Sequence, residues 1–155
     1  MDDSRIRSRR EPDSSGTLWL VDTRDRNERP QPGPALAPVD RDALQGPYFD
    51  GAYLLSPFYL RWMEGGGRGG LYRLQEIAPE GFFDSVYYTD YYARNGLIDE
   101  MGYIVPLGDA GAILVSLGRT QQLWSYSDTE HAELRAVEPV VASAVRRHYT
   151  LTAGA

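Results

Sequence analysis

Apolar residues along this chain fall into short blocks whose spacing alternates between that of strands and that of helices. Thr17–Asp22 is an apolar run ended by charge and predicts a first strand. Ile98–Leu107 and Ala112–Leu117 are rich in β-branched and apolar residues and predict two strands joined by the short connection 108–111. Pro106 marks the end of the first of these strands or an edge of the sheet. Residues 71–74 predict a further short strand.

An aromatic helix is predicted between these strands. Pro79 suits its first turn, and Asn95–Gly96 is a stop signal, because glycine readily takes the left-handed geometry that ends helices. The aromatic side chains form two adjoining rows on one broad face: Phe83, Tyr87 and Tyr91 in one row, Tyr88 and Tyr92 in the other. Upstream, residues 53–55 begin a helix or strand that Pro57 interrupts, and residues 58–63 predict a short helix.

The last predicted helix begins at a capping box. Ser127 and Glu130 can each satisfy a backbone N–H of the other, a pattern typical of a helix start. Pro139 removes a hydrogen bond in the middle of the apolar pattern and should kink or split the helix. Residues at three- and four-residue spacing on both sides of Pro139 form a seam along one side of the helix. The seam predicts either packing on the sheet or a dimer interface, and its members are Leu134, Val137, Val141, Ala144 and His148.

Taken together, these elements predict one α+β domain over residues 17–150, an antiparallel sheet flanked by helices. Residues 1–16 are charged and poor in large apolar side chains, so we expect a disordered tail, and residues 151–155 form a short second tail. Prolines make residues 29–47 a loop. The glycines of Glu64–Gly70 match a dinucleotide-binding spacing, but the following segment is too short for the required helix, so we expect a flexible loop.

Charge and composition narrow the function classes. The net charge is −6, and residues 1–41 hold eight Arg against eight Asp or Glu, which argues against direct nucleic-acid binding by this chain. There are no cysteines, so disulfides, thiolate zinc sites and cysteine nucleophiles are excluded. No apolar run reaches the about 18 residues of a membrane span, and we expect a cytoplasmic protein.

The candidate catalytic groups are few. His131 and His148 are 17 residues apart on a kinked helix, roughly 25 Å at about 1.5 Å per residue, so the sequence predicts no metal centre, and it predicts no cofactor. No serine motif accompanies them, and we expect a protein that is not an enzyme. Asp99 and Glu100 are neighbours in a strand, so at most one faces a pocket. The alternative is an exposed strand entry, with one carboxylate paired to Arg94 or Arg73.

Tyrosines are the strongest candidates for ligand contacts, because they offer flat apolar faces with a hydroxyl at the tip. The predicted site for a small amphipathic or aromatic ligand is Tyr87, Tyr88, Tyr91, Tyr92, Trp62, Tyr72 and Asp99. The same tyrosine stripe could instead fill the core beneath its helix, and the sequence leaves both readings open.

Several ordered blocks give the chain a resemblance to a known family: YFDGAYLLSPFY, GLYRLQEIAPEGFFDSVYYTDYY, LIDEMGYIVPL, ILVSLGR and LRAVEPVVASAVRRHY. These blocks, over residues 48–149, resemble the N-terminal sensory region of proteobacterial LuxR-type helix-turn-helix regulators. The resemblance implies a GAF/PAS-like sensory domain, a homodimer, and a DNA-binding domain that would follow the last helix. That domain is not in this sequence, so we expect a fragment or a stand-alone relic of the sensory part. The alternative is an interaction or dimerisation module without a ligand.

Overall fold

A five-stranded sheet in the order β2-β1-β5-β4-β3 forms the centre of the molecule. The computed structural model describes residues 20–22, 31–32, 51–120 and 124–153. The predicted tail 1–16 and, apart from residues 31–32, the loop 29–47 lie outside the described residues. All the strand pairs are antiparallel, which confirms the predicted α+β class. The strands are β1 (Leu20–Asp22), β2 (Gln31–Pro32), β3 (Gly70–Arg73), β4 (Leu97–Pro106) and β5 (Ala112–Thr120).

The hairpin of β4 and β5 is the longest pairing in the sheet and confirms the predicted strand pair. Its register runs from Leu97 opposite Thr120 to Pro106 opposite Ala112, and the short helix η5 (Gly108–Ala110) closes it. Pro106 ends β4, as its missing N–H predicts. At the other end a bulge between Leu97 and Asp99 shifts the register. The bulge matters because one extra residue changes which face the following side chains occupy.

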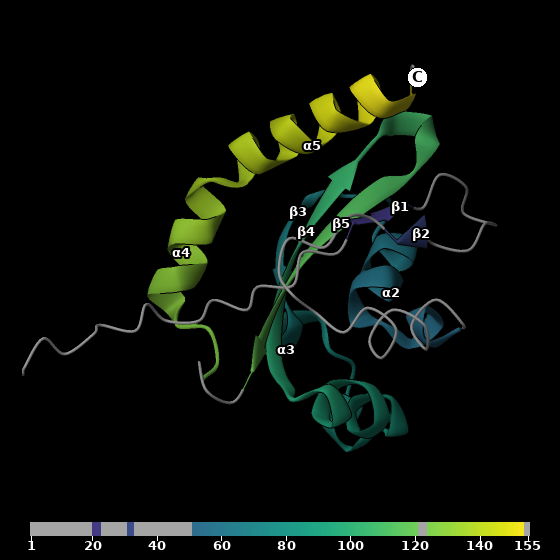
Figure 1. Ribbon diagram of the computed structural model, residues 1–155. Helices are drawn as coiled ribbons and strands as arrows, with labels where there is room; N and C mark the ends of the chain where they lie inside the picture. Colours follow the sequence, from purple (N-terminus) through teal and green to yellow (C-terminus); the bar gives the residue numbers. More distant parts are fainter. Residues whose placement is uncertain (1–19, 23–30, 33–50, 121–123, 154–155) are drawn as a thin grey trace, which may run out of the picture.

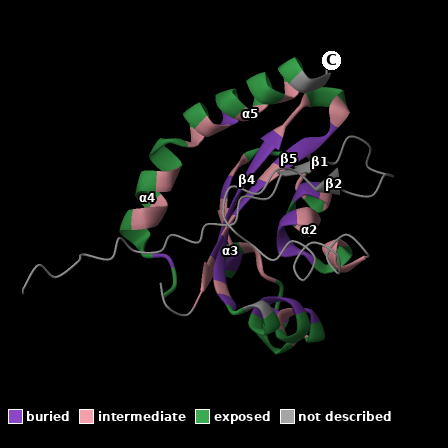
Figure 2. Cartoon of the chain, viewed as in Figure 1, coloured by how far each residue is buried: buried purple, intermediate pink, exposed green. Residues whose placement is uncertain are grey.

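Helices cover both faces of the sheet (Figure 1). One face carries α4 (Asp128–Ala136) and α5 (Glu138–Ala153). The opposite face carries η1 (Ala52–Leu55), α2 (Pro57–Glu64), α3 (Leu74–Ile77) and the tyrosine-rich segment. Buried residues line β4 and β5 between these layers, while the outer sides of α4 and α5 are exposed (Figure 2).

The last helix divides as its sequence predicts. The Ser127 side chain accepts from the Glu130 N–H, and the Glu130 carboxylate accepts from the Ser127 N–H, so the predicted capping box is present. Val137 separates α4 from α5, and Pro139 lies in the first turn of α5. Proline is tolerated there because the first N–H groups of a helix have no partner within it. The predicted break at Pro139 is therefore confirmed as two helices.

The start of the aromatic helix was wrongly predicted. Pro79 does not open it: Gly81, in the left-handed region at φ 75°, precedes a separate turn, η2 (Phe82–Asp84). The helix begins after Ser85, whose hydroxyl accepts from the Tyr88 N–H at 3.1 Å. It continues as the π-helical segment η3 (Tyr88–Tyr92) and η4 (Ala93–Asn95). Phe83 therefore lies outside this helix and is 46% exposed.

The end of the aromatic helix was predicted correctly, whereas the role of Pro57 was not. The aromatic helix ends at Gly96 in the left-handed region, φ 71°, as its stop signal predicts. Pro57 does not interrupt an element but opens α2, where its fixed φ suits the first helical position.

The ring of Phe58 on α2 packs over Gly102 in β4, and a Cβ at Gly102 would lie 2.7 Å from that ring. A glycine at this position lets α2 approach the sheet.

Candidate functional site

Asp99 and Glu100 are both buried at the start of β4, with 2% and 8% of their surface exposed. The predicted exposed strand entry is therefore wrong. Their side chains follow the alternation of a strand, so they occupy opposite faces of the sheet. Arg73, proposed as a partner for one of them, pairs instead with Asp128, at 2.6 Å.

Glu100 lies on the face of the sheet that carries the tyrosine-rich segment, called the tyrosine layer from here on. Its carboxylate accepts hydrogen bonds from the hydroxyls of Tyr92 and Ser116, one on each oxygen. Burial raises the pKa of Glu100 to about 6, since the two hydrogen bonds favour the ionised form and only partly oppose desolvation, and the charge of Asp99 raises it further. Burial likewise raises the pKa of Tyr92 well above its ordinary value, and the neighbouring Glu100 adds to this. Tyr92 is therefore a neutral donor at physiological pH.

Asp99 faces the opposite layer, the one that holds α4. One carboxylate oxygen accepts from the Tyr126 N–H at 2.8 Å, and the other accepts from the Glu100 N–H at 2.8 Å. The sequence grouped Asp99 with the tyrosines, but the structure places it across the sheet from them. Its neighbour Glu100 contacts the tyrosine layer in its stead.

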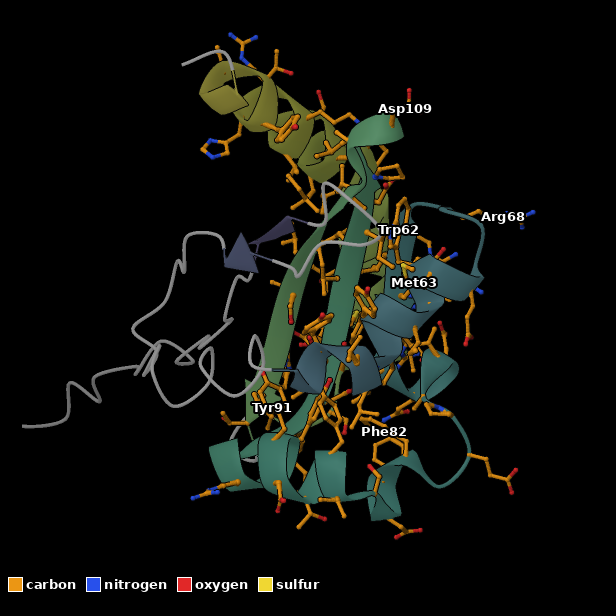
Figure 3. The ribbon with its side chains drawn as sticks, turned by 90° about the vertical axis from the view of Figure 1, so that its right-hand side faces the viewer. Trp62, Met63, Arg68, Phe82, Tyr91 and Asp109 are labelled. Carbon is orange, nitrogen blue, oxygen red and sulfur yellow. The ribbon has the colours of Figure 1, made fainter. Side chains whose placement is uncertain are left out.

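The four adjacent tyrosines make a packed aromatic cluster. Tyr87 and Tyr91 stack with centroids 5.3 Å apart, and Tyr88 and Tyr92 stack at 5.6 Å. Tyr87, Tyr91 and Tyr92 are buried in one hydrophobic cluster, and Tyr88 is half-buried against it. This arrangement agrees with the alternative hypothesis, in which the tyrosine stripe fills the core beneath its helix. Figure 3 shows Tyr91 at the same end of the sheet as Phe82, which comes from a separate helical turn.

A groove of about 590 Å³ lies between α2 and the β3–α3 segment. Its lining combines apolar walls with charged groups: Pro57, Leu60, Arg61, Glu64, Tyr72, Glu76, Ile77 and Pro79. The Arg61 guanidinium lies 5.1 Å from the centre of the Tyr72 ring, and the Tyr72 hydroxyl donates to the Arg68 carbonyl at 3.2 Å. Tyr72 is the residue of the predicted ligand set that lines this groove, and the surrounding groups were not singled out from the sequence.

Trp62 occupies the other side of α2. It is 7% exposed and packs in a cluster with Ile104 and Ala112. Figure 3 shows Trp62 between α2 and the strands, with Arg68 extending away from the molecule. Of the two residues that were expected to flank the glycine loop, Trp62 is core, whereas Tyr72 lines the groove and also packs against the cluster that contains Trp62.

The nominated dimer seam is divided between two sides of the helices. Leu134 and Val141 are half-buried against the cluster formed by the sheet. Val137 is 45% exposed, and Ala144 and His148 are exposed. The structure also exposes two large apolar residues that the seam omitted: Val140 at 70% and Leu151 at 66%.

The sequence did not predict the contacts of Glu100 with Tyr92 and Ser116. Glu100 lies eight residues after Tyr92 and sixteen before Ser116, and the hydrogen bonds depend on the bulge and on strand register. An acidic pair followed by an apolar strand was the available signal, and it was interpreted as one pocket residue, Asp99, or as an exposed strand entry. Among the helices that the structure describes, none is long and apolar enough to cross a membrane.

The fold of this chain is similar to the crystal structure of the VqsR ligand-binding domain from Pseudomonas aeruginosa, with a TM-score of 0.69 and 27% identity, over 86% of this chain and 76% of that one. The chain resembles a ligand-binding domain. It is also 29% identical, over 91 residues, to a protein inferred to be an HTH-type transcriptional regulator in the exeN 3′ region of Aeromonas salmonicida.

That second match covers 59% of this chain, and the chain spans about half the length of this curated relative, 46%. No protein-family model matches the sequence. One match is named a ligand-binding domain and the other a transcriptional regulator, and together they indicate a regulatory domain.

Proposed function

We propose that residues 17–150 form the GAF/PAS-like sensory domain of a LuxR-type transcription regulator that acts in the cytoplasm, not an enzyme. The observation that carries this proposal is the likeness to a ligand-binding domain over 86% of the chain at a TM-score of 0.69. The ordered sequence blocks over residues 48–149 support the same family. The net charge of −6 argues against direct DNA binding by this domain.

The ligand site that we propose is the groove between α2 and α3. Its volume of about 590 Å³ is in the range of small-molecule pockets, about 300–1,000 Å³. Tyr72 offers an aromatic face, Leu60 and Ile77 offer apolar walls, and Arg61 offers a cation beside them. These groups suit a small aromatic or amphipathic molecule with an acidic or polar end.

Dimerisation is the second part of the proposal. The exposed side of α4 and α5 presents Val137, Val140, Ala144 and His148, away from the sheet. This surface keeps the exposed members of the nominated seam and adds Val140. Leu134 and Val141 would support the interface indirectly, because they hold the helices on the sheet.

The groove can be tested with 1-anilinonaphthalene-8-sulfonate, an amphipathic aromatic anion, titrated by calorimetry into the full chain. We expect one binding site per chain whose affinity falls at least about tenfold in Tyr72→Ala, since an aromatic face and its cation contact are lost together. Arg61→Ala should weaken binding as well. Phe83→Ala, which removes an exposed ring outside the groove, is the matched control and should leave the affinity unchanged. Equal binding by wild type and Tyr72→Ala would contradict the groove assignment.

A second function has one specific observation in its favour. Tyr87, Tyr91 and Tyr92 are buried in the core cluster, which is what an interaction or dimerisation module without a ligand requires of its aromatic stripe. A dimer that binds no probe and retains no small molecule would favour this module over the sensory domain.

A further inference from the structure

The N-terminus of α4 is held to the sheet by two side chains from neighbouring strands. Asp99 of β4 accepts from the Tyr126 N–H at 2.8 Å. Arg73 of β3 donates to the Tyr126 carbonyl at 2.9 Å and to the Asp128 carboxylate at 2.6 Å. Tyr126 and Asp128 flank Ser127, the N-cap residue of α4. Both polar groups of the Tyr126 main chain are therefore bonded to the sheet at the point where α4 begins.

These polar contacts matter because α4 has little apolar anchoring. Although α4 is described over its whole length, it has no fully buried residue. Its apolar contact with the sheet cluster is the half-buried Leu134. Two further ties to the sheet are polar: Tyr103 donates to the Leu134 carbonyl at 2.7 Å, and Arg119 pairs with Glu130 at 2.5 Å. A helix that is held mainly by hydrogen bonds opens more readily than one packed in a core.

Each anchoring residue has a sequence neighbour that faces the opposite layer. Tyr72, next to Arg73, lines the groove, and Glu100, next to Asp99, bonds Tyr92. Arg73 pairs with Met101 in the strand register, so both neighbouring pairs lie at the same end of the β3–β4 ladder. Because adjacent strand residues point to opposite faces, a shift of this backbone affects both layers together.

Three hydrogen bonds, joined through the covalent structure of Glu100 and Asp99, connect Tyr92 to Tyr126. The Tyr92 hydroxyl donates to the Glu100 carboxylate, the Glu100 N–H donates to one Asp99 oxygen, and the Tyr126 N–H donates to the other. The bulge between Leu97 and Asp99 stands immediately before this pair. Strand alternation places one carboxylate on each face, and the bulge helps to set which carboxylate takes which face.

We propose that Asp99 and Arg73 form a latch between the two faces of the sheet. The latch couples the packing of the tyrosine cluster and the groove on one face to the attachment of the α4 N-terminus on the other. A change in the packing of the tyrosine helix or the groove then weakens or strengthens the contacts that Asp99 and Arg73 make at the start of α4. The proposal rests on the proposed function only where it names the groove as the ligand side. The coupling itself is a property of the chain alone, so it can be tested without a ligand.

Amide hydrogen exchange, measured by NMR on the full unliganded chain, tests the latch. In Asp99→Asn an NH2 donor replaces one of the two accepting oxygens and the negative charge is lost, so the amides of residues 126–130 should exchange at least about tenfold faster. Tyr92→Phe removes one hydroxyl on the opposite face and should also speed exchange at Tyr126, by at least about threefold. Tyr88→Phe removes a hydroxyl from the same helix, leaves both Glu100 hydrogen bonds in place, and should leave residues 126–130 unchanged.

The outcomes separate coupling from local damage. Acceleration of residues 126–130 in Tyr92→Phe but not in Tyr88→Phe supports the latch. Acceleration confined to residues 86–95 in Tyr92→Phe overturns it, and so does an unchanged Tyr126 amide in Asp99→Asn. Should Asp99→Asn fail to fold, Tyr92→Phe still decides, since it removes a single oxygen. Probe binding at the groove is measured separately, so failure of either proposal is distinguishable from failure of the other.

Discussion

Asp99 and Glu100 are adjacent in β4, yet their buried carboxylates make contacts on opposite faces of the sheet: Asp99 with the Tyr126 N–H, and Glu100 with the Tyr92 hydroxyl. A buried carboxylate is costly unless hydrogen bonds compensate its charge. Each of the two receives two hydrogen bonds, and each contacts a different helical layer. The pair therefore links the two layers through one strand.

Glu100 should make the stability of the protein depend on pH. Its pKa is about 6 in the folded chain against an ordinary value of 4.5. Between these pH values the folded state binds more protons than the unfolded state, so the free energy of unfolding falls as pH rises through this window. The loss amounts to about 2 kcal/mol, and it persists at higher pH.

Glu100→Gln removes this titration and should abolish that part of the pH dependence. We expect the stability of the variant relative to wild type to rise by about 2 kcal/mol between about pH 3.5 and 7, as measured by urea unfolding. The comparison cancels other groups, such as Glu130, whose pKa is lowered first by the Ser127 N–H and then by Arg119. Parallel pH profiles for the two proteins would refute the assigned role of Glu100.

Gly102 should tolerate alanine poorly. A Cβ there would lie 2.7 Å from two atoms of the Phe58 ring and 2.8 Å from Leu114, and Phe58 is 1% exposed. We expect Gly102→Ala to destabilise the chain by about 1–3 kcal/mol, the usual cost of overpacking. Gly118→Ala is the matched control, because it adds a Cβ on the neighbouring strand whose one close contact, at 2.8 Å, is the end of the flexible Leu97 side chain. Thermal unfolding should show the larger loss for Gly102→Ala, and equal losses would contradict this packing.

The capping box should contribute measurably to the hold on α4. Ser127→Ala removes the acceptor for the Glu130 N–H, which lies 3.2 Å from the serine oxygen. Loss of such a cap costs about 1 kcal/mol, so the midpoint of thermal unfolding should fall by a few degrees. Ser143→Ala, a serine-to-alanine change at an exposed position inside α5, serves as the control and should not lower the midpoint. A Ser127→Ala midpoint equal to that of Ser143→Ala would argue against the cap.

Aspartate substitutions at two adjacent valines can separate the proposed dimer surface from the core. Val140 is 70% exposed, whereas Val141 packs against the sheet cluster. We expect Val140→Asp to give a folded monomer by light scattering, because it places a charge in the interface alone. Val141→Asp should instead lower the unfolding midpoint strongly, since it buries an unpaired charge. A Val140→Asp protein that remains dimeric would remove this surface from the proposal.

Elements with strong local signals were predicted well from the sequence. The β4–β5 strands, the capping box at Ser127 and the helix break at Pro139 each depend on residues close together in the chain. The start of the aromatic helix was misplaced because Pro79 is a good first-turn residue, and the competing signal at Gly81 and Ser85 is a weaker one. Local preference indicated the helix but not its first residue.

The candidate site was predicted less well, because it depends on tertiary contacts. The bulge before Asp99 and the register of Glu100 opposite Gly118 decide which face each carboxylate occupies. Tyr72 was identified, but Arg61 and Ile77 join it only because α2 and α3 are folded against each other. Burial of Tyr87, Tyr91 and Tyr92 likewise depends on Phe58 and Leu74, which come from other elements.

Native mass spectrometry of the purified, untagged chain tests the central claim most directly. A sensory domain predicts a dimer that carries additional non-protein mass, and that mass gives the size of the ligand. Loss of the additional mass in Tyr72→Ala, with the dimer retained, would assign the ligand to the groove. A monomer with no additional mass would contradict both the ligand and the dimer.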